Sequence, residues 1–229
     1  MITLLHGDDT TKSRTELVRL KHLTVGKELR ELDGKLVNED ILIQALSSSS
    51  LFGGDTPVTI DNLFSSQGKK LKRIETLATI IKRESTNVDV LLWEEKEVGK
   101  TALTQLGTSI TVKLFKLPVI IFQFLDSVRP QNSPSLLRLY TDIVKQEAPE
   151  LVHVMLLRRL RQLMELKSGI APVGLQSWQS ARLTNQAQSF TIDQLLQAYK
   201  RVVTNDLSMK TGTGALSIRA NTELLLSSL

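Results

Sequence analysis

The stretch Ile2-Thr3-Leu4-Leu5-His6-Gly7-Asp8-Asp9-Thr10 decides the fold that we expect for the first half of the chain. Its apolar run, which ends at a His-Gly pair, is typical of a buried strand. The two aspartates and the threonine supply side-chain oxygens that cap a helix, and apolar residues at 17, 18 and 20 continue that helix. A strand, a glycine turn and a helix in this order begin an α/β unit.

Strands and helices continue to alternate up to about residue 115. The spacing of apolar residues predicts helices over residues 41–46, with Asn38 as a cap, and over residues 71–81. Apolar and β-branched runs predict strands at residues 58–60, 88–93 and 109–115. This alternation favours a parallel sheet with helices on both faces.

After residue 115 the pattern is helical throughout, with no strand that the sequence supports. The predicted helices are residues 119–128, 133–146, 150–167, a weaker one around Trp178 and Leu183, 192–207, and a last one ending at about 226. Ser133, Thr191 and Thr222 are the expected N-caps, and Thr191 forms a capping box with Gln194. We therefore expect two domains, an α/β domain over residues 1–114 and a helical bundle over residues 115–229.

Composition excludes several classes of protein. The chain has 229 residues, of which 41% are hydrophobic and 23% charged, as in ordinary globular proteins. No apolar run approaches the ~20 residues that span a bilayer, and an acid pair interrupts the start where a signal peptide stays apolar, so we expect a cytoplasmic protein without membrane contact. The absence of cysteine excludes disulfides and thiolate zinc sites. A net charge of +5 permits contact with nucleic acid without establishing it.

The turn over residues 6–12 occupies the position where nucleotide-binding α/β domains keep a phosphate loop. Such a loop needs several glycines for close backbone approach, and this turn has only Gly7. Asp8 and Asp9 stand where phosphate would lie, and their charge would repel it. A second triplet, Gly99-Lys100-Thr101, resembles the end of a phosphate-loop motif, but it has Glu94 where the first glycine belongs. We therefore predict no bound cofactor.

The remaining ionisable residues suggest no active site. Glu94, Glu95 and Glu97 follow a predicted strand, but three lysines lie near them in the sequence, so a solvated charged turn is preferred to a metal site. The three histidines are scattered along the chain. We expect no catalytic residue and no metal site.

A cluster of arginines lies on the longest predicted helix. Arg158, Arg159 and Arg161 place positive charge where DNA phosphates could be met, because phosphate contact requires only cations along a surface. A solvated helix face is the alternative interpretation of this cluster.

The stretch Ser47-Ser48-Ser49-Ser50-Leu51-Phe52-Gly53-Gly54 joins a predicted helix to a predicted strand. Serine and glycine runs favour loops. A large apolar pair, Leu51 and Phe52, lies at the tip of this loop. Either the loop folds back and buries the pair in the core, or the pair binds a partner.

Several segments, in their order and spacing, resemble the delta subunit family of the bacterial DNA polymerase III clamp loader. The resemblance is carried by Gly7-Asp8-Asp9 after the first strand, Leu51-Phe52-Gly53 before the strand that ends in Asp61-Asn62, Trp93-Glu94-Glu95 with Lys100 and Leu103, the run from Leu156 to Leu163, the run from Phe190 to Leu195, and Asp206 with Lys210-Thr211-Gly212.

The resemblance implies an AAA+-like (P-loop-fold) α/β domain with a degenerate phosphate loop, followed by a helical collar through which subunits assemble. It implies a non-catalytic subunit of the DNA polymerase III holoenzyme that binds the sliding clamp and helps to open it for loading on primed DNA. The clamp-binding residues implied by position are Leu51 and Phe52. The implied partners are the sliding clamp, other clamp-loader subunits and primed DNA.

The chain departs from this family in two places. Where some members of that family have a third apolar residue of the clamp-binding wedge, this chain has Ser49. In addition, no lid domain separates residue 115 from the helical half. Two other functions remain open from the sequence. One is a nucleotide-dependent ATPase of the same AAA+ type, and the other is a basic helical DNA-binding module.

Overall fold

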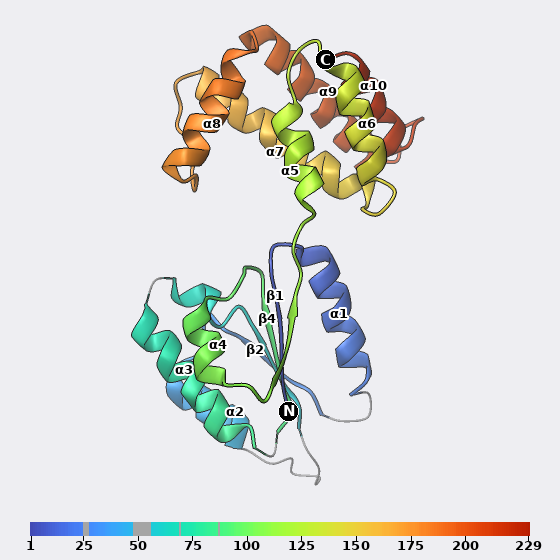
Figure 1. Ribbon diagram of the computed structural model, residues 1–229. Coiled ribbons are helices and arrows are strands. Elements are labelled where there is room, and N and C mark those ends of the chain that lie inside the picture. The colour runs from blue at the N-terminus through green and yellow to red at the C-terminus, as the bar shows by residue number, and fades with distance from the viewer. Residues whose placement is uncertain (25–27, 48–55, 69, 87) are drawn as a thin grey trace. The chain divides into compact units, whose positions relative to one another are not determined.

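The computed structural model describes residues 1–24, 28–47, 56–68, 70–86 and 88–229 (Figure 1). The chain forms two compact units, Met1–Leu117 and Pro118–Leu229, which are described separately below. The boundary between the units lies slightly beyond the end of the α/β domain expected from the sequence. Within the described ranges, no helix combines the length and the apolar character that crossing a bilayer requires.

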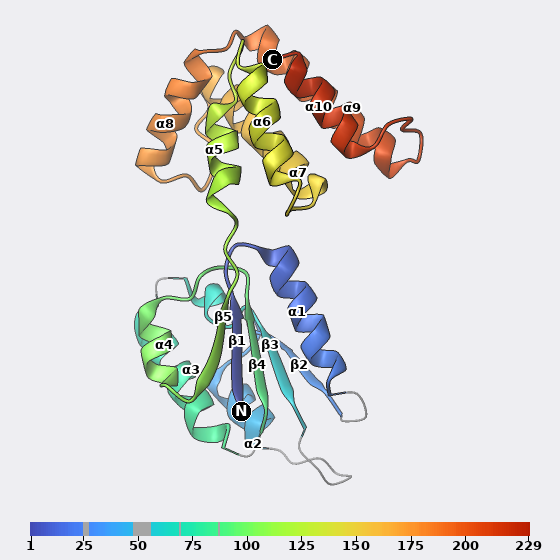
Figure 2. The same ribbon diagram turned by 45° about the vertical axis from the view of Figure 1, so that its right-hand side comes forward.

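The first unit is built on a parallel sheet of five strands in the order β2-β3-β4-β1-β5 (Figure 2). The strands are β1 (Ile2–His6), β2 (Arg30–Asp33), β3 (Val58–Asp61), β4 (Val90–Glu94) and β5 (Ile110–Leu114). Because β1 pairs with β4 on one side and β5 on the other, both of its edges are hydrogen-bonded and all its residues are buried. The opening strand of the sequence is therefore the interior of the sheet.

Helices cover both faces of this sheet. One face carries α1 (Thr10–His22), and the other carries α2 (Glu39–Ser47), α3 (Leu71–Glu84) and α4 (Lys100–Leu106) (Figures 1 and 2). The larger core lies on the side of the three helices and includes Leu42, Leu77 and Leu92, while a smaller cluster of Leu5, Leu17 and Trp93 lies under α1. Successive strand residues supply the two cores because their side chains alternate between the faces.

The second unit contains only helices among its described residues. They are α5 (Val119–Ser127), α6 (Ser133–Ile143), α7 (Pro149–Lys167), α8 (Ser177–Gln188), α9 (Ile192–Lys210) and α10 (Ile218–Ser227). The long helix α7 packs against α5, α8, α9 and α10, and its Leu156, Leu160 and Leu163 are completely buried. The expected architecture, a parallel α/β sheet followed by a helical part, is confirmed.

The elements of the first unit that were not predicted include an edge strand and a short α-helix. The first is β2, which pairs with β3 at the edge of the sheet. Its sequence, Arg-Glu-Leu-Asp, lacks the apolar run that identifies a buried strand. Helix α4 is short and begins at Lys100, directly after Gly99. The Gly99-Lys100-Thr101 triplet is thus the start of a helix that packs on α3.

The predicted helix caps have mixed outcomes. Thr191 caps α9 and forms the expected capping box with Gln194. Thr222 was expected to cap the last helix, and this is wrong, because α10 begins earlier and Ser217 caps it by accepting a hydrogen bond from Ala220 N at 3.2 Å. Thr222 lies inside α10 and is buried, where its hydroxyl donates to the carbonyl of Ile218 at 2.8 Å. Ser133 is the first residue of α6, which Asn132 precedes as N-cap.

Replacing Gly7 tests the packing at the end of β1. Gly7 has a φ of 133°, and a Cβ atom there would collide with the backbone of Phe115. We expect Gly7→Ala to lower the free energy of unfolding by at least about 2 kcal/mol, through backbone strain and this collision. The matched control is Gly99→Ala, where φ is −67° and no atom lies within 4 Å of the added Cβ. Urea unfolding followed by circular dichroism measures both, and equal loss in the two variants would contradict the packing described here.

Candidate functional site

The proposed clamp-binding pair, Leu51 and Phe52, lies outside the described residues, as does Ser49. The structure describes the two ends of the chain around this stretch. On one side, α2 ends at Ser47 and its residue Leu46 is buried in the core. On the other side, Thr56 is buried and leads through Pro57 into β3. Both ends are therefore anchored in the α/β core.

The turn after β1 is filled by the protein's own groups. Phe115 N donates to the carbonyl of His6 at 2.8 Å, and Asp9 N donates to the carbonyl of Phe115 at 3.1 Å. The Asp9 carboxylate caps α1, because its Oδ1 accepts from Lys12 N at 3.0 Å and its Oδ2 lies 3.3 Å from Lys12 Nζ. Asp8 Oδ1 accepts from the backbone N–H of Leu117 at 2.9 Å. A side-chain carboxylate thus meets the amino end of α1, where a phosphate loop would place phosphate.

His6, at the end of β1, is part of the packing. Its imidazole is buried and its Nδ1 accepts a hydrogen bond from Val98 N at 3.0 Å. Burial lowers the pKa of His6, and nearby Lys116 acts in the same direction while Glu97 opposes it. The neutral imidazole therefore ties the end of β1 to the segment that precedes α4.

Glu94 is buried, so the solvated turn expected for it is wrong. Its Oε1 accepts from Phe64 N at 2.7 Å, and its Oε2 accepts from Ser65 N at 2.9 Å and from Ser65 Oγ at 2.6 Å. Burial raises the pKa of Glu94, while these hydrogen bonds act in the opposite direction. The carboxylate holds the start of the short helix η1 (Ser65–Gln67). Over the described ranges, no cluster of three or more His, Asp or Glu side chains is arranged to hold a metal ion.

A second polar group at the same edge of the sheet involves Arg14 of α1. Its guanidinium lies 3.5 Å from the centre of the Trp93 ring, and its Nη1 lies 2.8 Å from Asp61 Oδ2. The indole N–H of Trp93 donates to Ser13 Oγ at 3.1 Å. Ligands of open α/β sheets bind beyond the carboxyl ends of the strands. Here side chains of β3, β4 and α1 bind one another at that edge.

The three arginines predicted to contact DNA lie in different surroundings. Arg158 is exposed, whereas the side chain of Arg159 is only 13% exposed. Arg159 Nη1 lies 3.0 Å from Asp126 Oδ1, and burial lowers its pKa although Asp126 opposes that shift. Arg161 is exposed and pairs with Glu165 one turn later at 2.8 Å. DNA contact by these residues stays a prediction, and Arg159 additionally has a structural partner.

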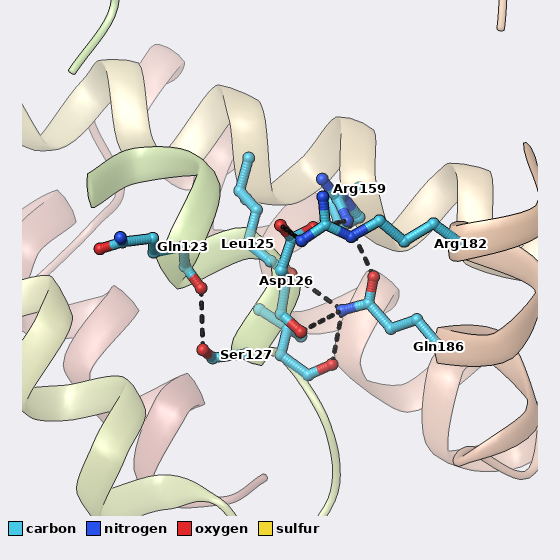
Figure 3. A network of polar contacts seen from close by, with 8 residues as sticks. Gln123, Leu125, Asp126, Ser127, Arg159, Arg182 and Gln186 are labelled. Carbon is cyan, nitrogen blue, oxygen red and sulfur yellow. Dashed lines mark hydrogen bonds and ion pairs between the residues drawn. The ribbon is translucent and has the colours of Figure 1, made fainter. Parts of the chain in front are cut away.

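Arg159 belongs to a polar network that joins α5, α7 and α8 (Figure 3). Its Nη1 donates to Gln186 Oε1 at 2.8 Å, and Arg182 pairs with the second oxygen of Asp126 at 2.7 Å. The amide of Gln186 donates to the carbonyls of Leu125 at 2.8 Å and Val128 at 2.7 Å. The network thus satisfies carbonyl groups at the carboxyl end of α5, which otherwise lack intrahelical partners.

Next to this network, α5, α7 and α8 line a groove of about 400 Å³, which we call the α7–α8 groove. Its apolar lining is Phe122, Leu125, Met155, Leu175, Trp178 and Leu183, and its charged lining is Asp126, Arg158, Arg159 and Arg182. Trp178 is 64% exposed although it is the largest of these side chains. The sequence did not indicate this groove, because its residues come from three helices and the segment before α8, whose packing no local pattern encodes.

Comparison with known proteins finds similarity in structure only. No family model matches the sequence, and no curated protein matches it. The DNA clamp loader delta protein of Bacillus subtilis is similar at 15% identity and a TM-score of 0.47, over 98% of this chain and 94% of that chain. A DNA polymerase III gamma subunit-related protein of Thermotoga maritima is similar at 13% identity and a TM-score of 0.38, over 99% and 93%. Identities and TM-scores this low support no conclusion about what the chain does.

Removing the charge of Asp126 tests the network. Asp126→Asn would leave the largely buried guanidinium of Arg159 without its counter-charge, so we expect a loss of about 3 kcal/mol in the free energy of unfolding. The matched control is Glu165→Gln on the same helix, which removes the partner of the exposed Arg161 and should cost less than about 1 kcal/mol. Urea unfolding compares the two. Equal losses would show that Arg159 is not held by Asp126.

Proposed function

We propose that this chain is a non-catalytic clamp-loader subunit that binds a sliding clamp and helps to open it for loading on primed DNA. The observation that carries the proposal is the closed turn after β1, where Asp9 and the backbone of Phe115 occupy the position of a phosphate loop. An AAA+-like sheet with this turn closed is better suited to binding a partner than to hydrolysing a nucleotide.

The proposed clamp-binding element is the pair Leu51 and Phe52, which the sequence resemblance implies. The burial of Leu46 before the loop and of Thr56 after it supports this assignment, because anchored ends reduce the entropy lost when a loop binds. Apolar side chains of this size contribute about 1.5–3 kcal/mol each when they are buried in a pocket. Ser49 in place of a third apolar residue leaves two anchors for the clamp.

Opening of the clamp would follow from preferential binding. A ligand shifts a conformational equilibrium only by the difference in its affinity for the two states. The subunit would therefore bind the open ring more tightly than the closed ring. In this role it needs no catalytic group of its own.

The helical unit is proposed to assemble with other clamp-loader subunits of a DNA polymerase III holoenzyme in the cytoplasm. In such an assembly, exposed cations such as Arg158 on α7 would meet the phosphates of primed DNA. Arg161 would do so only by exchanging its partner Glu165 for phosphate.

The double variant Leu51→Ala, Phe52→Ala tests the proposal directly. Loss of two buried apolar anchors is expected to weaken binding to the sliding clamp encoded in the same genome by at least about 100-fold. Surface plasmon resonance with immobilised clamp measures the change. The matched control is Leu36→Ala, an apolar residue that is 76% exposed on the same unit and lies outside the loop.

Circular dichroism should show the same helix content in the double variant, the control and the unmodified protein. Undiminished clamp affinity in a folded double variant would refute the assignment of these residues. Failure of the unmodified protein to bind the clamp at all would refute the proposed function. Tight binding of ATP in isothermal titration would instead favour the motor ATPase.

A further inference from the structure

The α7–α8 groove is lined by residues of α5, α7 and α8, and half of its lining residues are apolar. Met155 and Arg158 of α7 and Trp178 and Arg182 of α8 line it, and Phe122 of α5 contributes to the lining. The α7 residues are three positions apart and the α8 residues four apart, so each pair lies on one face of its helix. The groove thus runs between two regular surfaces, which is a form suited to a peptide segment.

The groove carries an excess of positive charge. Asp126 is its only lining carboxylate among the described residues, and both oxygens of Asp126 are already paired, one with Arg159 and one with Arg182. Arg158 is exposed, and within the described ranges no carboxylate lies within ion-pairing distance of it. Arg182 is 64% exposed despite its bond to Asp126. An occupant with carboxylates would therefore complement the charge of the groove.

The groove also offers an anchor for a protein partner. Trp178 presents most of its indole ring to solvent beside Arg158 and Arg182. Tryptophan and arginine are the residues that most often dominate the energy of protein interfaces. The network of Asp126, Arg159 and Gln186 fixes the neighbouring helices (Figure 3), so little ordering would be required of the groove on binding.

We propose that the α7–α8 groove binds an acidic amphipathic segment of a partner protein. Apolar side chains of the segment enter between α7 and α8 against Trp178 and Met155, and its carboxylates pair with Arg158 and Arg182. This interaction belongs to the helical unit and goes beyond the proposed clamp binding, which uses the loop of the α/β unit.

The lining favours a protein over single-stranded nucleic acid as the occupant. A nucleic-acid groove follows the phosphate backbone with a row of cations and stacks bases on aromatic rings. Here six of the twelve lining residues are aliphatic or aromatic, and the only exposed indole in the described ranges is that of Trp178. Arg159 is largely buried by its own partners.

The full chain can be tested with a set of synthetic amphipathic peptides. The set carries Glu, Leu and Phe at helical and extended spacings, and a matched set has Lys in place of every Glu. The chain has two tryptophans, and Trp93 is buried while Trp178 is exposed, so quenching by acrylamide reports mainly on Trp178. We expect Glu peptides to protect Trp178 from the quencher and to shift its emission to shorter wavelength, and added salt to weaken the effect.

Charge reversal at the groove supplies the specificity test. Arg158→Glu should weaken binding of the best Glu peptide at least about tenfold, because it replaces an attraction by a repulsion. The matched control is Arg138→Glu, which makes the same change at an exposed position of α6 outside the groove and should leave affinity unchanged.

Three results would overturn the proposal. The first is that no Glu peptide protects Trp178. The second is that the Lys set binds as well as the Glu set. The third is that an oligothymidylate protects Trp178 and competes with the peptides, which would identify a single-stranded nucleic-acid site. Clamp binding by the Arg158→Glu variant should be unchanged, because the proposed clamp contact uses Leu51 and Phe52, so this test fails or succeeds separately from the proposed clamp binding.

Discussion

The structure of the first unit depends on two backbone hydrogen bonds around Gly7. Phe115 donates to His6 and accepts from Asp9, so the chain leaving β5 lies against the turn that leaves β1. At a φ of 133°, a Cβ on residue 7 would collide with the backbone of Phe115, so only glycine fits there. The same contact brings the chain to Leu117, whose N–H binds Asp8. The contact of Phe115 with His6 and Asp9 thus fills the turn after β1 and fixes the last residues of the α/β unit.

The charged side chains near this turn are paired with groups of the same unit. The charged groups at the carboxyl edge of the sheet bind partners within the unit, as Glu94 does with Ser65 and Arg14 does with Asp61. Such internal pairing satisfies buried polar groups at the expense of contacts to a ligand. The functions proposed for the chain therefore depend on other residues, namely Leu51 and Phe52 and those of the α7–α8 groove.

Local patterns in the sequence predict much of the fold. The apolar strand and the Asp cap at the start, and the capping box at Thr191, depend on residues within a few positions of one another, and the structure has them. Strand β2 escaped prediction because a polar edge strand lacks a periodic signal. The pairing of Arg159 with Asp126 and Gln186 could not be predicted, because the partners come from three helices whose packing no local pattern encodes.

The central claim is that the chain binds a sliding clamp through Leu51 and Phe52, which lie between α2 and β3 in the sequence. Backbone amide hydrogen exchange of the full chain, with and without the clamp, measures this most directly. The account predicts slower exchange over residues 48–55 when the clamp is added, and no change over residues 6–12 when ATP is added. Unchanged exchange over residues 48–55 with the clamp bound, or protection of residues 6–12 by ATP, would contradict it.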